Sequence, residues 1–194
     1  TVTTITGTVV AGDGTTPLPN ATVDLDFTGG VVVAGTGLQT TTDAQGRFRY
    51  VVAVPAPGTF TLTAHSPKTY ATTSQASGTA TVQGGTLDVG AILLPISILR
   101  GFATTGPSTP VQSVSAFVTD TNGAVTFADQ VSQNTFEFFE LAAGTYELTA
   151  VDDNSGLSAK VSVTLPTAQS VVTGVQVQLP IVGAVQVQVV DENG

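Results

Sequence analysis

Apolar and polar residues alternate with a period of two along much of the chain, and this pattern predicts β-strands. Residues 21–27 read ATVDLDF, which places Val23, Leu25 and Phe27 on one face of a strand. No segment keeps a helical period over ten residues. The sequence therefore predicts an all-β protein. The same alternation recurs at residues 47–52, 59–63, 146–149 and 175–179.

Turn signals separate the alternating runs. Asp43-Ala44-Gln45-Gly46 and Asp120-Thr121-Asn122-Gly123 both fit a tight turn that ends in a residue with positive φ, which glycine adopts without a Cβ clash. In the second half of the chain, Asn134 stands where Gly46 stands in the first, and we expect it to take the same conformation. Roughly seven short strands in each ~90 residues predict Ig-like, two-sheet β-sandwiches.

The chain contains an internal repeat. Residues 57–64 read PGTFTLTA and residues 143–150 read AGTYELTA, and other landmarks recur in the same order around both segments. We therefore predict tandem seven-stranded sandwiches, with repeat one at residues 1–95 and repeat two at residues 96–180. No Gly/Ser-rich linker separates them, so we expect a semi-rigid junction.

Residues 181–194 read IVGAVQVQVVDENG and resemble the opening strand of another repeat. Gly183 stands where Gly7 and Gly101 stand in the two repeats. We predict that this segment is either the first strand of a third repeat or a strand donated to a neighbouring molecule. The predicted inter-subunit or inter-domain strand carries Val182, Val185, Val187 and Val189.

Charge and composition exclude several classes of function. The formal net charge is −9, with 5 basic residues and no basic cluster, which argues against nucleic-acid binding and against an anionic membrane surface. No apolar run approaches the roughly 20 residues of a spanning helix, so we predict no membrane insertion in this segment. Without cysteine, disulfides and thiolate metal sites are also excluded.

Composition also bears on location. Threonine is the commonest residue and lysine is scarce. The sequence starts at Thr1, which fits either removal of a signal peptide or a segment of a longer protein. We expect an extracellular or cell-surface location.

Four segments of repeat one resemble a known family: Gly7-Thr8-Val9, residues 17–23 (PLPNATV), residues 42–48 (TDAQGRF) and residues 57–62 (PGTFTL). They resemble the carboxypeptidase regulatory-like, transthyretin-like (prealbumin-like) β-sandwich, and are similar also to the B-type repeats of collagen adhesins. Repeat two keeps residues 141–148 (LAAGTYEL) of this pattern. The resemblance implies a spacer, an adhesin stalk or a non-catalytic module beside a secreted enzyme.

The adhesin repeats often carry a Lys–Asn isopeptide bond with the lysine on the first strand. Here the lysines, Lys68 and Lys160, both lie late in their repeats. We therefore predict no isopeptide bond of that arrangement.

Catalytic chemistry has little support in the sequence. His65 is the only histidine, and a Ser-His-Asp triad or a histidine metal site would have to use it. We expect it instead to be a loop residue after a strand that ends at Ala64. We predict no catalytic residue, no cofactor and no metal ligand, although Asp152 and Asp153 lie in a turn that leaves calcium binding open.

One modification site is suggested. Asn20-Ala21-Thr22 is an N-glycosylation sequon in a predicted loop, and its use depends on the source of the protein. We interpret the threonines mainly as strand-forming residues, and O-linked glycosylation of them is the second interpretation.

These observations favour a structural repeat segment of an extracellular fibre, filament, stalk or adhesin, whose partners are neighbouring copies or repeats. The alternative is a non-catalytic accessory or carbohydrate-binding module of a secreted enzyme, with a carbohydrate or host-surface ligand. An exposed row of Tyr50, Tyr70 or Tyr146 would favour the alternative. The predicted core of repeat one is Val9, Val23, Leu25, Phe27, Phe48, Tyr50, Phe60, Leu62 and Ile92. The predicted core of repeat two is Phe102, Phe117, Phe136, Phe138, Tyr146, Leu148, Val161, Val163 and Val177.

Overall fold

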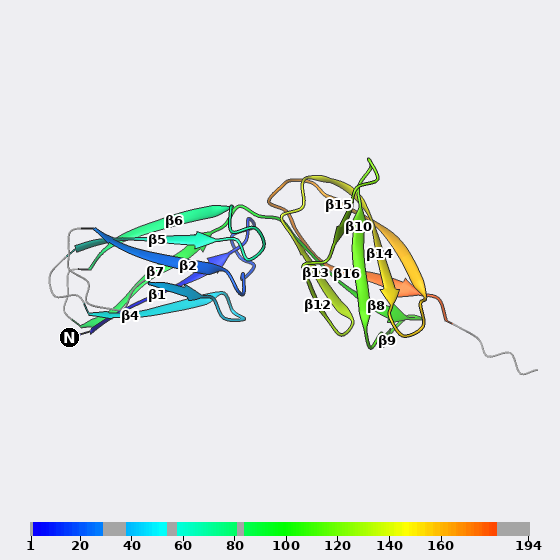
Figure 1. The fold of residues 1–194 in the computed structure, drawn as a ribbon, viewed down its shortest axis with the longest axis horizontal. Coiled ribbons are helices and arrows are strands. Elements are labelled where there is room, and N and C mark those ends of the chain that lie inside the picture. Colours follow the sequence, from blue (N-terminus) through cyan, green and yellow to red (C-terminus); the bar gives the residue numbers. More distant parts are fainter. Residues whose placement is uncertain (1, 29–37, 54–57, 81–83, 182–194) are drawn as a thin grey trace, which may run out of the picture.

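A computed structural model describes residues 2–28, 38–53, 58–80 and 84–181. Every regular element among these residues is a β-strand, which confirms the predicted all-β fold. The strands form four sheets, arranged as two pairs that lie end to end (Figure 1). Within the described ranges there is no helix of the length and apolar character needed to cross a membrane.

The first pair of sheets is built from strands β1 to β7. One sheet has the order β4-β1-β7 and the other has the order β3-β2-β5-β6. β1 is antiparallel to β4 and parallel to β7, so it lies at the centre of its sheet. The bounds are β1 (Val2–Val10), β2 (Thr22–Thr28), β3 (Gln39–Thr41), β4 (Arg47–Ala53), β5 (Gly58–His65), β6 (Thr73–Ala80) and β7 (Gly85–Leu93).

The second pair is built from strands β8 to β16. One sheet has the order β12-β13-β8-β16, with β9 added to β8, and the other has the order β11-β10-β14-β15. The bounds are β8 (Ile98–Thr105), β9 (Thr109–Pro110), β10 (Val114–Thr119), β11 (Val125–Phe127), β12 (Gln130–Ser132), β13 (Thr135–Phe139), β14 (Gly144–Asp152), β15 (Ser158–Leu165) and β16 (Val171–Leu179).

The two pairs of sheets share one topology. The order β4-β1-β7 returns as β13-β8-β16, and β3-β2-β5-β6 returns as β11-β10-β14-β15. A matching contact supports the correspondence: Gly7 is paired with Phe48 in one sheet, and Gly101 is paired with Phe136 in the other. A Cβ atom added to Gly7 or Gly101 would lie 2.6 or 2.4 Å from the facing ring. Both glycines therefore make room for an inward aromatic ring.

The apolar faces of the strands enclose two core clusters. The buried predicted residues are Val9, Val23, Leu25, Phe48, Tyr50, Phe60, Leu62 and Ile92 in the first cluster, and Phe136, Phe138, Tyr146, Leu148, Val163 and Val177 in the second. Phe27 and Val161 are partly buried against these clusters.

Phe102 and Phe117 were wrongly predicted as core residues. Both are only partly buried and belong to neither core cluster. The inward positions of β10 are instead Val114, Ala116 and Val118, which alternate with Phe117. In β8 the buried neighbour of Phe102 is Ala103, and in β10 the buried neighbours of Phe117 are Ala116 and Val118. The aromatic residue of each strand therefore lies on the opposite face of the sheet.

The prediction of a residue with positive φ at this turn is correct for Gly46 in the first pair of sheets and wrong for Asn134 in the second. Gly46 has a φ of 71°, and its carbonyl accepts a hydrogen bond from the Val9 amide. The carbonyl of Asn134 accepts the corresponding bond from Ala103. However, the positive φ, 52°, belongs to Gln133, because β12 and β13 are joined there by a two-residue hairpin turn.

Residues 182–194 lie outside the described residues, and so do Gly183 and the four valines predicted to form a pairing strand, Val182, Val185, Val187 and Val189. The last described strand, β16, runs parallel to β8 and ends at Leu179 beside Thr105. The chain therefore leaves the second pair of sheets at the end that is remote from the first pair (Figure 1).

Candidate functional site

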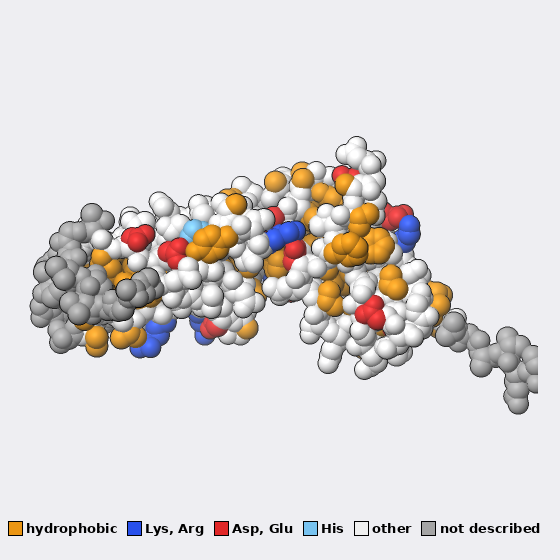
Figure 2. Space-filling model, in the orientation of Figure 1, with side chains coloured by type: hydrophobic (Ala, Val, Ile, Leu, Met, Phe, Trp, Pro, Cys, Tyr) orange, Lys and Arg blue, Asp and Glu red, His pale blue; other side chains and the backbone are white. Residues whose placement is uncertain are grey.

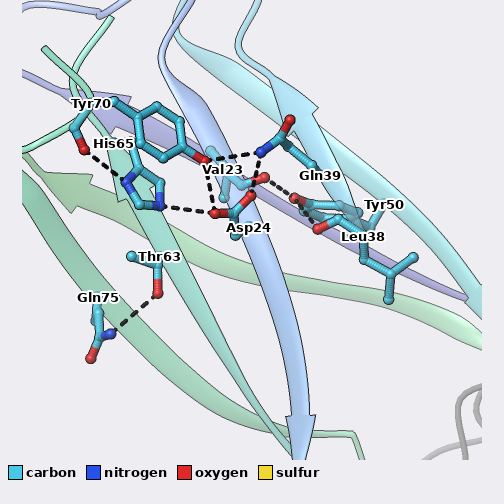
Figure 3. Close-up of polar contacts among 9 residues, drawn as sticks. All are labelled: Val23, Asp24, Leu38, Gln39, Tyr50, Thr63, His65, Tyr70 and Gln75. Carbon is cyan, nitrogen blue, oxygen red and sulfur yellow. Dashed lines mark hydrogen bonds and ion pairs between the residues drawn. The ribbon is translucent and has the colours of Figure 1, made fainter. Parts of the chain in front are cut away.

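A polar cluster lies on the outer face of the sheet β3-β2-β5-β6 and centres on Asp24. His65, at the end of β5, places its Nε2 atom 2.9 Å from Oδ2 of Asp24. The Tyr70 hydroxyl donates a hydrogen bond of 3.0 Å to the same oxygen, and Gln39 donates one of 2.8 Å to Oδ1 (Figure 3). Three side chains from β3, β5 and the loop after β5 thus converge on one carboxylate of β2.

Both nitrogens of the His65 ring lie close to an oxygen atom within this cluster. Its Nδ1 atom lies 3.1 Å from the carbonyl oxygen of Tyr70, and the two rings stack with centroids 3.9 Å apart. A serine hydrolase needs a hydroxyl nucleophile beside the histidine nitrogen that accepts its proton. Here both nitrogens face Asp24 or the Tyr70 carbonyl, and neither faces a hydroxyl nucleophile. We call the group of Asp24, His65, Tyr70 and Gln39 the clasp.

The expected position of His65 needs one correction. The strand extends through His65, which is the last residue of β5, and does not end at Ala64. His65 pairs in register with Thr22 on β2, and this pairing brings its side chain beside Asp24, two residues along the same face.

Tyrosine hydroxyls reinforce the clasp and the adjoining sheet contact. Burial and the hydrogen bond to Asp24 raise the pKa of Tyr70, so its hydroxyl stays protonated as a donor. Burial, with the nearby Asp24 charge, also raises the pKa of Tyr50. The Tyr50 hydroxyl donates to the carbonyl of Val23 and, at 3.3 Å, to that of Leu38. Tyr50 thereby connects the two facing sheets.

The loop that follows His65 reaches the second pair of sheets through Lys68. The Lys68 ammonium lies 3.1 Å from Oδ2 of Asp129 and donates a hydrogen bond of 3.1 Å to the carbonyl of Phe139. The Phe139 amide in turn donates a bond of 2.7 Å to the same Asp129 oxygen. One cation therefore connects the loop after β5 with two segments of the other sheet pair.

Apolar packing crosses the same junction. Ile96, Ile98 and Phe139 are at most 2% exposed and belong to the core cluster of the first pair of sheets, although β8 and β13 belong to the second. The hydroxyl of Ser97 is buried and donates a bond of 2.7 Å to the carbonyl of Leu141. The short segment between β7 and β8 is thus packed between the two pairs of sheets.

The remaining predicted site residues belong neither to the polar cluster around Asp24 nor to the contact between Lys68 and Asp129. Asn20 is exposed in a turn with a φ of 60°, two residues before the first residue of β2. The carboxylate of Asp153 accepts hydrogen bonds from Ser113 and Ser115, and that of Asp152 accepts one from Ser155. Across the described ranges, no group of three or more histidine, cysteine, aspartate or glutamate residues has the geometry to hold a metal ion.

The three tyrosines do not form an exposed row. Tyr50 and Tyr146 are 5% and 8% exposed and lie in the two cores, while Tyr70 is 45% exposed and stacks on His65. The predicted sign of a sugar-binding surface, an exposed tyrosine row, is therefore missing.

Sequence reasoning did not identify the contact between Lys68 and Asp129. The two residues are far apart in the chain and belong to different sheets, and neither lies in a recognisable motif. The only signal was the scarcity of lysine, which makes each one worth examining.

No protein-family model matches this chain, and no curated protein sequence matches it. Solved structures with similarity include the Bacillus anthracis TIE protein, at 14% identity and a TM-score of 0.38, covering 92% of this chain and 34% of that protein. Others are GBS52, the minor pilin of Streptococcus agalactiae, at 16% identity, TM-score 0.35 and coverage of 96% and 99%, and the shaft pilin SpaA of Lactobacillus rhamnosus GG, at 11% identity, TM-score 0.37 and coverage of 95% and 99%. Similarity at this level does not bear on function.

Proposed function

We propose that this chain is a structural repeat segment of an extracellular fibre, filament, stalk or adhesin at the cell surface. In this proposal residues 1–95 and 96–180 are two β-sandwich repeats, and residues 181–194 pair with a further repeat or a neighbouring copy. The chain has no enzymatic role, and its partners are copies or repeats of itself.

The observation that carries the proposal is the junction. Two sheet pairs of the same topology lie end to end, and the connecting segment is packed by Ile96, Ile98 and Phe139 instead of being a solvated linker. The Lys68–Asp129 contact adds a second connection away from the main chain. A junction held at two points resists bending, which is the property a stalk or fibre requires and a free-standing binding module does not.

Electron microscopy of the native material provides the test. Negative-stain images of the protein from its source should show filaments or surface projections with a regular repeat along their length. Dispersed, globular particles, or co-purification with a catalytic subunit, would contradict the proposal and favour an accessory module.

Solution scattering of the purified chain tests the junction itself. Wild type should have the maximum dimension of two sheet pairs held end to end. Insertion of a Gly-Ser-Gly-Ser segment between Pro95 and Ile96 should broaden the distribution of distances within the particle. An unchanged distribution would show that the junction is flexible already.

A further inference from the structure

β4 forms an outer edge of its sheet, and this edge has no partner strand among the described residues. The counterpart of β4 in the second pair of sheets, β13, is covered by β12. At the start of this edge the turn already satisfies Arg47, whose carbonyl accepts a bond from the Asp43 amide and whose amide donates one to Oδ1 of Asp43. By strand alternation, the main-chain groups of Arg49 and Val51 point to the same side. Such an edge is a template for another strand.

The free edge carries two arginines without an acidic partner. Lys68, Arg100 and Lys160 each lie within 3.2 Å of a carboxylate, whereas Arg47 and Arg49 form no ion pair with any described residue. Two of the 5 basic residues of a chain with net charge −9 are thus gathered on one edge strand. They carry the positive charge that an acidic segment would need.

A groove adjoins these arginines. It has a volume of about 740 Å³ and is lined by Thr6, Thr8, Arg47, Arg49 and Asp88, and by residues 40–43 beside β3. The groove is open to solvent. Figure 2 shows positively charged side chains along the lower edge of the first sheet pair. An extended segment beside β4 would therefore lie against polar side chains on one face.

We propose that the free edge of β4 receives residues 184–192 of a second copy as an antiparallel strand. This inference rests on the proposed fibre function and names its acceptor. The segment reads AVQVQVVDE, so its residues alternate and its acidic end carries Asp191 and Glu192. Alternation places Glu192 on the face of Gln186 and Gln188, away from the valine row of 185, 187 and 189. When the valines continue the apolar core of the first sheet pair, Glu192 lies on the opposite, solvent-facing side of the strand. Arg47 and Arg49 lie on that same side of β4.

The polarity of the chain fits this pairing. β4 runs from Arg47, paired with Thr8 near the junction, to Ala53, paired with Val2 at the outer end of the first sheet pair. The C-terminal segment leaves from the opposite end of the molecule, so it reaches β4 of the next copy at Ala53 (Figure 1). Running antiparallel to β4, it ends beside Arg49 and Arg47. Opposite charges therefore meet where the strand ends, in a head-to-tail chain of copies.

Charge reversal in the full 194-residue chain tests the pairing by sedimentation velocity over a concentration series. Arg49→Glu should weaken self-association about tenfold or more, because like charges then face each other at the strand end. The matched control is Lys160→Glu, which makes the same charge change on the exposed strand β15 and should leave association within about twofold of wild type. Glu192→Arg should weaken association as Arg49→Glu does.

Mixing the two charge-reversed chains gives the decisive measurement. Arg49→Glu chains and Glu192→Arg chains should co-assemble, because the reversed donor then meets the reversed acceptor. A synthetic peptide of residues 181–194, added to ¹⁵N-labelled full chain, should shift the amide resonances of Arg49 and Val51.

Three results would overturn the inference. The first is a loss of association with Lys160→Glu as large as that with Arg49→Glu. The second is self-association that neither Arg49→Glu nor Glu192→Arg changes. The third is a wild-type chain that stays monomeric at every concentration. The second result would leave the fibre function intact with another acceptor, and all three are independent of whether native material forms filaments in the microscope.

Discussion

Replacing Phe60 by alanine tests whether the strand faces of the first sheet pair are correctly assigned. Phe60 is 1% exposed, and its ring lies 5.9 Å from that of Phe27. The ring also fills the space that a side chain would take at Gly78, where an added Cβ would lie 2.5 Å from the ring. Because Gly78 has no side chain to move into the vacated volume, the cavity should stay largely open.

The magnitude follows from burial. Loss of a fully buried phenylalanine side chain costs the transfer free energy and the cavity term together, about 3–5 kcal/mol. A small domain is stable by about 5–15 kcal/mol in total, so the loss is a large share. Phe127 is the matched control, since it is 69% exposed and contacts Phe117 at the sheet surface. Phe127→Ala should cost about 1 kcal/mol or less.

Urea unfolding of the full chain, followed by far-ultraviolet circular dichroism, measures both costs. Where the two cores unfold in separate transitions, Tyr146→Ala in the second core identifies which transition belongs to which sheet pair. Equal costs for Phe60→Ala and Phe127→Ala would refute the assignment of the inward face of β5.

Three further outcomes are expected. Gly101→Ala should lower stability by about 1–3 kcal/mol, seen as a lower melting temperature, because the new methyl group would lie 2.4 Å from the Phe136 ring; an unchanged melting temperature would contradict the close packing. Asp13 has its pKa lowered to about 2, since hydrogen bonds from Thr16 and its neighbour outweigh burial. Its stabilisation is therefore present above pH ~4 and is lost as pH falls towards ~2, so wild type should lose more stability over that range than Asp13→Asn. Lys68→Met should change the unfolding free energy by only about 0–1 kcal/mol but widen the distance distribution in solution scattering; an unchanged distribution would show that this ion pair does not hold the junction.

Local chemistry allowed much of the fold to be predicted. Alternation at residues 21–27 predicted the buried face of β2, because a strand that is covered on one side must place every second residue in the core. Gly46 was predicted correctly because glycine adopts its φ of 71° without the Cβ clash that other residues incur. The repeated sequence runs through residues 58–64 and 144–150, which lie in β5 and β14, and these strands hold the same place in two sheets of the same order.

Prediction failed where two faces of a strand were both apolar. β10 carries Ala116, Phe117 and Val118 in succession, and hydrophobicity alone favours the aromatic residue as the inward one. The register with β14 decides otherwise, because the space between the sheets accepts Val118 opposite Leu148 and leaves Phe117 outside opposite Thr149. Register depends on the neighbouring strand, so a single strand's sequence does not contain it.

The clasp and the junction are further features that the sequence did not predict. The cluster of His65 and Asp24 exists because β2 and β5 pair in one particular register. The Lys68–Asp129 contact exists because the two sheet pairs pack against each other at the junction. Sequence determined which segments form strands, since that depends on neighbouring residues and their side chains. Which polar groups meet was decided only by tertiary structure, because such contacts join residues that the chain brings together after the strands have paired.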